Sequence, residues 1–159
     1  MTETSPVVHL TPLAAPRAGA SGVTIANTEC RIVDLETGND VDPGATGELW
    51  VRGPQVMKGY LNNPTATAET IDAEGWLRTG DIGRFDQDGY LFLTDRVKDL
   101  IKYKGFQVAP PELEATLLTY PNIADVAVIG VPDADAGEVP MAFVVPGADT
   151  GRGAGFSRR

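Results

Sequence analysis

A carboxylate beside a glycine is the first feature of the sequence that could do chemistry. Thr79-Gly80-Asp81 directly follows a short strand-like segment, Trp76 to Arg78. A carboxylate held on a glycine-turned loop can accept two parallel hydrogen bonds, which matches the vicinal hydroxyls of a ribose. The same residues could instead form an Asx turn, in which Asp81 only accepts from nearby backbone N–H groups. The local sequence leaves both interpretations open.

A cationic strip follows this motif. Arg96, Lys98, Lys102 and Lys104 are the only basic residues between positions 96 and 145, and they fall within nine residues. The whole chain is acidic, with 13 Lys plus Arg against 22 Asp plus Glu. Concentrated positive charge in an acidic chain favours a specific anion, such as a phosphate-bearing ligand. The alternatives are a strand edge charged against aggregation and a charged linker.

Three further features, all within the first 30 residues, carry less weight. Thr2 and Glu3 place a hydroxyl beside a carboxylate, which could serve a hard cation such as Mg²⁺. His9, the single histidine, has no Cys or Ser partner at a suggestive spacing. Cys30 opens a strand-like segment and is expected to be a small buried hydrophobe.

Four segments, taken in order, resemble the adenylate-forming superfamily and, within it, the acyl-CoA and aryl-CoA ligases of the 4-coumarate–CoA ligase and luciferase branch. They are MTETSP, GELWVRGPQVMKGYLNNPTATAET, GWLRTGDIGRFDQDGYLFLTDRVKDLIKYKGFQVAPPELE and ADVAVIGVPDADAGEVPMAFVV. The resemblance runs from residue 1 to about residue 145. The ordered series is far more specific than any one of its motifs.

The resemblance implies an ATP-dependent ligase. In such enzymes a carboxylate attacks the α-phosphate of ATP to give an acyl-adenylate, and the thiol of coenzyme A then displaces AMP. The expected cofactors are therefore ATP or AMP, Mg²⁺ and coenzyme A. The expected substrate is a small carboxylic acid, whose identity the sequence does not specify.

The resemblance also assigns roles in the nucleotide site. Glu3 matches the Mg²⁺-associated acid, and Thr2 its phosphate-contacting neighbour. Asp81 matches the aspartate that grips the ribose hydroxyls, with Arg96 as the arginine beside it. Lys98 matches the hinge about which a small domain swings between the two half-reactions.

The catalytic residues implied for the second half-reaction come next along the chain. Lys102 matches a lysine brought to the active site for thioester formation. Lys104 and Gly105 lie where the thiol arm of coenzyme A would enter. Gln107 falls at a position associated with the active site in this branch.

Two features of the family are missing from the sequence. There is no glycine-rich Ser/Thr phosphate-binding loop, and the text after Val145 has no equivalent of the closing lysine used for adenylation. Losing one such phosphate-directed donor typically lowers the rate by about 10²–10³. We therefore expect an internal fragment of a ligase, inactive as an isolated chain, and leave open whether another chain complements it. The alternative is a non-catalytic remnant, or a weak nucleotide-binding module without enzymatic activity.

The patterning predicts an α+β fold in three parts. Residues 1–95 are expected to be a β-rich remnant of the large adenylating domain, residues 96–145 a small and incomplete α+β C-terminal domain, and residues 146–159 a disordered tail. Predicted strands span 29–35, 46–52, 76–78, 81–85, 90–94, 124–131 and 139–145. A hairpin of 97–103 and 106–108 is expected to turn at Lys104-Gly105. Helices are expected over 64–71 and from residue 110.

Composition excludes several classes of partner and location. A net charge of −9 makes nonspecific nucleic-acid binding unfavourable, so no nucleic-acid partner is expected. No run approaches the roughly 18 apolar residues of a membrane span. The single Cys30 cannot form an internal disulfide, which favours a reducing, cytoplasmic location.

Overall fold

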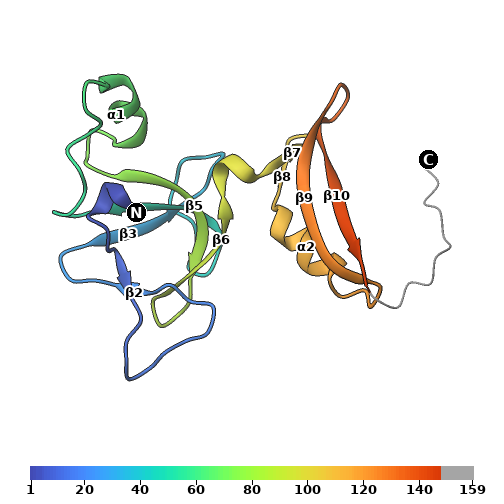
Figure 1. Ribbon diagram of the computed structural model, residues 1–159. Helices are drawn as coiled ribbons and strands as arrows, with labels where there is room; N and C mark the ends of the chain where they lie inside the picture. The colour runs from blue at the N-terminus through green and yellow to red at the C-terminus, as the bar shows by residue number, and fades with distance from the viewer. Residues whose placement is uncertain (148–159) are drawn as a thin grey trace. The chain divides into compact units, whose positions relative to one another are not determined.

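The computed structural model describes residues 1–147, which form two compact units. The first unit ends at Lys98 and the second begins at Asp99 (Figure 1). The sequence placed the change of domain at residue 95, and its assignment of the two parts to family domains stays a prediction. Of the predicted tail, Pro146 is the last residue of a strand and residues 148–159 lie outside the described residues.

The first unit is built on one six-stranded antiparallel sheet. Its spatial order is β1-β2-β6-β5-β4-β3. The strands are β1 (His9–Leu10), β2 (Gly22–Thr24), β3 (Glu29–Val33), β4 (Gly47–Arg52), β5 (Leu77–Phe85) and β6 (Tyr90–Arg96). Strands β3, β4 and β6 fall where the sequence predicted strands, β3 from alternating polar and apolar residues and β4 and β6 from the turn residues beside them. Strands β1 and β2 were not predicted, because two and three residues are too few to show a period.

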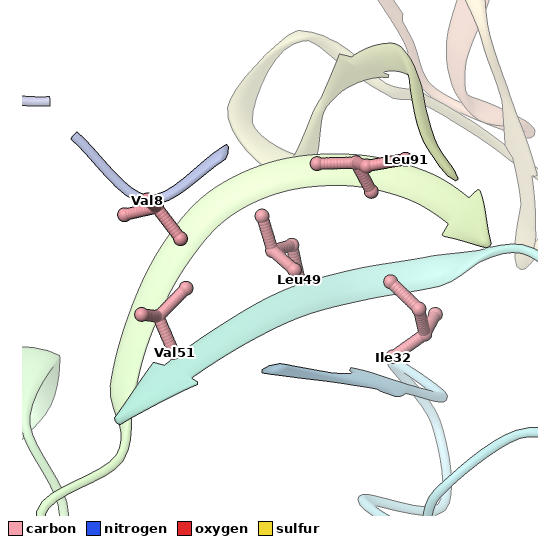
Figure 2. Close-up of a cluster of buried hydrophobic side chains, with 5 residues drawn as sticks. All are labelled: Val8, Ile32, Leu49, Val51 and Leu91. Atoms are coloured by element: carbon pink, nitrogen blue, oxygen red, sulfur yellow. The ribbon is translucent and has the colours of Figure 1, made fainter. Parts of the chain in front are cut away.

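The main core of this unit lies on one face of β4. Leu49 and Val51 point to this face, while Trp50 between them points to the other, and Leu49 and Val51 are 2% and 0% exposed. They pack with Val8, Ile32 and Leu91 (Figure 2). Val8 precedes β1 and Ile32 lies on β3, although these strands form opposite edges of the sheet. The sheet is therefore curled, so that its two edges share one core.

A second cluster covers the opposite face of β4. Trp50 is buried there with Val33 and Trp76. The Arg31 guanidinium lies 4.7 Å from the Trp50 ring and 4.4 Å from the Trp76 ring. The Arg78 guanidinium lies 4.8 Å from the Trp50 ring. Cation–π contacts from two sides therefore hold Trp50 in place.

The helices of this unit lie outside the sheet. The predicted helix is present as α1 (Pro64–Thr70), and the Asn63 Oδ1 accepts a hydrogen bond from the Ala66 N–H at 3.0 Å. Pro64 occupies the first turn, as predicted. A 3₁₀ turn, η1 (Thr2–Thr4), begins the chain and buries Thr4 completely. No helix within residues 1–147 is long and apolar enough to cross a bilayer.

Two strand predictions in the middle of the chain were wrong. Residues 76–78 and 81–85 were predicted as separate strands around a Thr79-Gly80 loop, but β5 runs unbroken from Leu77 to Phe85. The expected strand over 97–103 is instead a 3₁₀ turn, η2 (Val97–Asp99), followed by a short strand, β7 (Ile101–Tyr103). Strand β5 stays continuous because Gly80, at φ +70°, absorbs extra residues as a bulge.

The second unit is a four-stranded antiparallel sheet with one helix. Its order is β8-β7-β10-β9. Besides β7, its elements are β8 (Phe106–Val108), α2 (Pro110–Leu117), β9 (Ile123–Asp133) and β10 (Gly137–Pro146). Leu113 and Leu117 of α2 pack on Ile101, Val126 and Val128. The predicted turn between β7 and β8 is confirmed, because Lys104 and Gly105 both have positive φ, 49° and 86°, as a type I′ turn requires.

Candidate functional site

Asp81 and Arg96 occupy directly opposed positions on β5 and β6. The Arg96 Nε lies 3.0 Å from the Asp81 Oδ1, with the aspartate side chain 19% exposed and the arginine side chain 51% exposed. The Arg96 Nη2 also donates to the Thr79 carbonyl at 3.5 Å. The tertiary fold thus joins the two residues that the resemblance assigns to the nucleotide sugar. Both groups remain accessible to a ligand.

A bulge in β5 sets the position of Asp81. Glu48 pairs with Ile82 and Trp50 with Arg78, so three β5 residues lie opposite the single residue Leu49. The Thr79 hydroxyl donates to the Leu49 carbonyl at 2.8 Å and accepts from the Asp81 N–H at 3.0 Å. The sequence predicted a loop around the carboxylate. In the structure this segment is a bulge within β5, held by the hydrogen bonds of the Thr79 hydroxyl.

Two hollows adjoin this ion pair. The larger, about 460 Å³, is lined by residues that include Glu3, Tyr60, Gly80, Arg96 and Lys98. The smaller, about 260 Å³, is lined by residues that include His9, Leu49 and Asp81. The arginine therefore faces one hollow and the aspartate borders the other, and Met1 lines both. A ligand that engaged both charged groups would span the boundary between the two hollows.

Glu3 is held at the edge of the larger hollow by two hydroxyls. The Thr2 hydroxyl donates to its Oε2 at 3.0 Å, and the Tyr60 hydroxyl donates to its Oε1 at 3.3 Å. The pKa of Glu3 lies below its usual value, chiefly because the residue's own backbone N–H bonds the carboxylate, with help from both hydroxyls. Glu3 is therefore ionised at neutral pH. Tyr60 is a member of this group that sequence reasoning missed, because nothing in the order of residues links positions 3 and 60.

A cation site built only of protein side chains is not formed here. Among residues 1–147, no group of three or more His, Cys, Asp or Glu side chains could hold a metal ion. Mg²⁺ commonly binds through one or two carboxylates together with substrate phosphates and water. The single ionised carboxylate of Glu3 fits Mg²⁺ in that shared form.

Lys98 is exposed in η2 and also lines the larger hollow. It is the last residue of the first compact unit. That place in the chain suits a pivot, and the hinge role itself stays a prediction.

The remaining predicted residues belong to the second unit. Lys102 and Gln107 pair directly across the β7–β8 hairpin, and both are exposed. Cross-strand partners point to the same side of a sheet, so the two side chains are neighbours. The Lys102 N–H donates to the Glu138 Oε2 at 2.8 Å, which ties β7 to β10. Lys104 and Gly105 form the turn that joins the two strands.

Comparison with known proteins identifies the family. A model of AMP-binding enzymes matches residues 1–61, and a model of the AMP-binding enzyme C-terminal domain matches residues 112–155. The 4-coumarate–CoA ligase 2 of Nicotiana tabacum is 56% identical over 150 residues, which cover 91% of this chain and 28% of the relative. The chain belongs to the AMP-binding, adenylate-forming enzymes. The predicted superfamily is therefore confirmed.

Solved structures of AMP-binding enzymes agree with this assignment. ATP-bound MatB from Rhodopseudomonas palustris superposes with a TM-score of 0.83 at 38% identity, covering 92% of this chain and 29% of that one. The o-succinylbenzoate CoA synthetase of Bacillus subtilis, in complex with its acyl-adenylate, superposes with a TM-score of 0.74 at 36% identity, covering 92% of this chain and 30% of that one. The predicted α+β fold class is confirmed. Enzymes of this AMP-binding family use ATP and coenzyme A, and this chain spans about 28% of the length of the curated relative.

Proposed function

We propose that the chain supplies the ribose-facing and phosphate-facing part of the nucleotide site of an ATP-dependent acyl-CoA or aryl-CoA ligase. In the first half-reaction, a small carboxylic acid and ATP give an acyl-adenylate and pyrophosphate. In the second, the thiol of coenzyme A displaces AMP and forms a thioester. The observation that carries the proposal is the Asp81–Arg96 ion pair beside the hollow that also contains Glu3.

Each residue of the first unit has a role that suits its contacts. The Asp81 carboxylate accepts hydrogen bonds from the ribose hydroxyls, and Arg96 orients that carboxylate through the ion pair between them. Glu3 would hold a Mg²⁺ ion, which would supply neutralisation of phosphate charge. The Thr2 hydroxyl, which bonds Glu3 in this structure, is placed to donate to a phosphate oxygen.

The hairpin of the second unit serves thioester formation in this proposal. Lys102 supplies positive charge to the AMP phosphate as it leaves, and Gln107, on the same face, supplies a hydrogen bond beside it. Lys104 and Gly105 border the entry of the coenzyme A arm. Lys98 acts as the pivot between the half-reactions. A cytoplasmic location accompanies this function, because the single Cys30 favours a reducing compartment.

A second candidate function is a nucleotide-binding module without catalysis. The absence of a glycine-rich Ser/Thr phosphate loop from the sequence favours it for the chain acting alone. The two candidates share AMP binding and differ in turnover. Pyrophosphate exchange into ATP, with 4-coumarate as the trial acid, separates them. We expect no exchange by the isolated chain, and exchange that Asp81→Ala abolishes would contradict that expectation.

The test of the shared nucleotide site is AMP binding by the 159-residue chain, followed by NMR or calorimetry. We expect Asp81→Asn and Arg96→Met each to weaken binding about tenfold, as for the loss of a charged hydrogen bond. The matched controls are Asp42→Asn, an exposed aspartate, and Arg84→Met, whose guanidinium packs on the Phe92 ring. The controls should leave affinity unchanged. Equal loss in the controls, or no loss in the site variants, would refute the proposed site.

A further inference from the structure

Glu48 makes a bridge that the sequence did not single out. It lies on β4, and its two carboxylate oxygens accept hydrogen bonds from different strands. The Oε1 accepts from the Gly80 N–H at 2.9 Å, and the Oε2 accepts from the Trp50 Nε1–H at 2.8 Å. One side chain therefore links the centre of the β5 bulge to a buried indole on β4.

The Gly80 N–H needs this acceptor because of the bulge. Three residues of β5 stand opposite Leu49, so the regular ladder is interrupted at Gly80. Gly80 also adopts φ +70°, which turns its peptide out of the strand direction. A half-buried N–H without an acceptor would destabilise this arrangement. Glu48 holds the middle of the bulge, while the Thr79 hydroxyl holds its two ends.

We propose that Glu48 is a positioning residue of the nucleotide site. By fixing the Gly80 peptide it sets the path of β5 into Asp81, and so keeps the Asp81 carboxylate on the Arg96 guanidinium. Glu48 acts through Gly80 and Asp81 on the ribose. The inference rests on the proposed function in one respect, namely that Asp81 and Arg96 bind the nucleotide.

The chemistry of the bridge requires a carboxylate. The Gly80 N–H and the Trp50 Nε1–H are both donors, so the side chain between them must accept on both sides. Glutamine has the same shape but offers only one acceptor, because its amide nitrogen is a donor. Trp50 cannot easily turn away, since Arg31 and Arg78 hold its ring. In Glu48→Gln, the new amide N–H would therefore face another donor, either the Gly80 N–H or the Trp50 Nε1–H.

Removing the indole donor should relieve that conflict. In Glu48→Gln combined with Trp50→Phe, the glutamine oxygen is available to the Gly80 N–H, and its amide nitrogen no longer meets a donor. The informative set is therefore Glu48→Gln, Trp50→Phe and the double variant, each made in the full 159-residue chain. AMP is the probe, and the readouts are its dissociation constant and the NMR signals of the Gly80 N–H and the Arg96 Nε–H.

We expect Glu48→Gln to weaken AMP binding about tenfold and to move both NMR signals, in line with the loss of a hydrogen bond to a charged group. Trp50→Phe should change affinity by less than about twofold, and the double variant should return to within about twofold of Trp50→Phe. Rescue of affinity by a second substitution would not follow from a merely structural loss at Glu48. A folded Glu48→Gln chain with unchanged affinity and unchanged signals would overturn the proposal.

The remaining outcomes also decide the question. If Glu48→Gln does not fold, the double variant alone is measured, and a folded double variant that fails to bind AMP overturns the proposal. If the unaltered chain does not bind AMP, the proposed function fails, and the Arg96 Nε–H signal still tests Glu48. Movement of that signal in Glu48→Gln, with recovery in the double variant, would support positioning. An unmoved signal would refute it.

Discussion

His9 and Cys30 place the Nε2 and Sγ atoms 3.7 Å apart, although 21 positions separate them in the chain. The sequence indicated no such partner for His9, and the structure corrects that expectation. Burial raises the pKa of the Cys30 thiol, and burial lowers the pKa of His9 to about 4. Both groups are therefore neutral at pH 7. The pair is a packing contact within the first unit and lacks the thiolate that a nucleophile needs.

The depressed pKa of His9 predicts acid destabilisation. The unfolded chain takes up a proton near pH 6.5 and the folded chain only near pH 4, so stability is full above pH 6.5 and falls as the pH is lowered toward 4. We expect the free energy of unfolding in urea to fall by about 1–2 kcal/mol between pH 7.5 and pH 5. His9→Gln should remove most of that slope. A slope that persists in His9→Gln would assign it to other groups.

Gly22 is the glycine at which the fold tolerates a side chain least. It has φ +105°, and an alanine Cβ there would lie 2.2 Å from the Leu10 carbonyl carbon on the neighbouring strand. We expect Gly22→Ala to cost more than about 3 kcal/mol of stability and to detach β1 from β2, because backbone strain and a backbone clash add. Urea unfolding and the protection of the β1 amides against hydrogen exchange measure both effects.

Gly89 provides the matched control for that substitution. It has a similar positive φ, +80°, but nothing lies within 4 Å of a Cβ built there. Gly89→Ala should therefore show the strain alone, about 1 kcal/mol. If both variants lost the same free energy of unfolding, the clash with the β1 backbone would not contribute to the destabilisation.

The Arg31 side chain is expected to stabilise both indoles of the protein. Its guanidinium lies over Trp50 and Trp76, and it also pairs with Asp40 at 3.5 Å. We expect Arg31→Met to cost about 1–2 kcal/mol and to change tryptophan fluorescence, since two cation–π contacts are lost. Asp40→Asn removes only the ion pair and should cost less than about 0.5 kcal/mol. If Asp40→Asn matched Arg31→Met, the ion pair rather than the rings would account for the effect.

Tyr60 is predicted to tune the acidity of Glu3. The Tyr60 hydroxyl bonds the ionised carboxylate, and its removal in Tyr60→Phe takes away one of the groups that lower the Glu3 pKa. The pKa should therefore rise toward its ordinary value without reaching it, because the backbone N–H and Thr2 remain. Carboxyl carbon NMR titration of Glu3 measures the change. Tyr120→Phe, an exposed tyrosine of the second unit, is the control and should leave the Glu3 pKa unchanged.

Local signals in the sequence were sufficient for many of the elements. Alternating polar and apolar residues predicted β3, and the Asn63-Pro64 start predicted α1. The turn at Lys104-Gly105 could also be predicted locally, because it needs positive φ, which glycine adopts readily and few other residues adopt. The motif series also brought Asp81 and Arg96 to attention as a pair. In each case the determining residues are adjacent in the chain, or their types carry the signal themselves.

Only the tertiary structure revealed how those residues are held. Strand β5 continues through Gly80 because Glu48, more than thirty positions away, accepts the N–H that the bulge displaces. Tyr60 reaches Glu3 across 57 positions, and His9 reaches Cys30 across 21. Contacts of this kind depend on how the strands and the loops between them come together in the folded unit. A one-dimensional pattern encodes the tendency of each segment to form a strand, whereas the partner of each polar group is decided when the sheet closes.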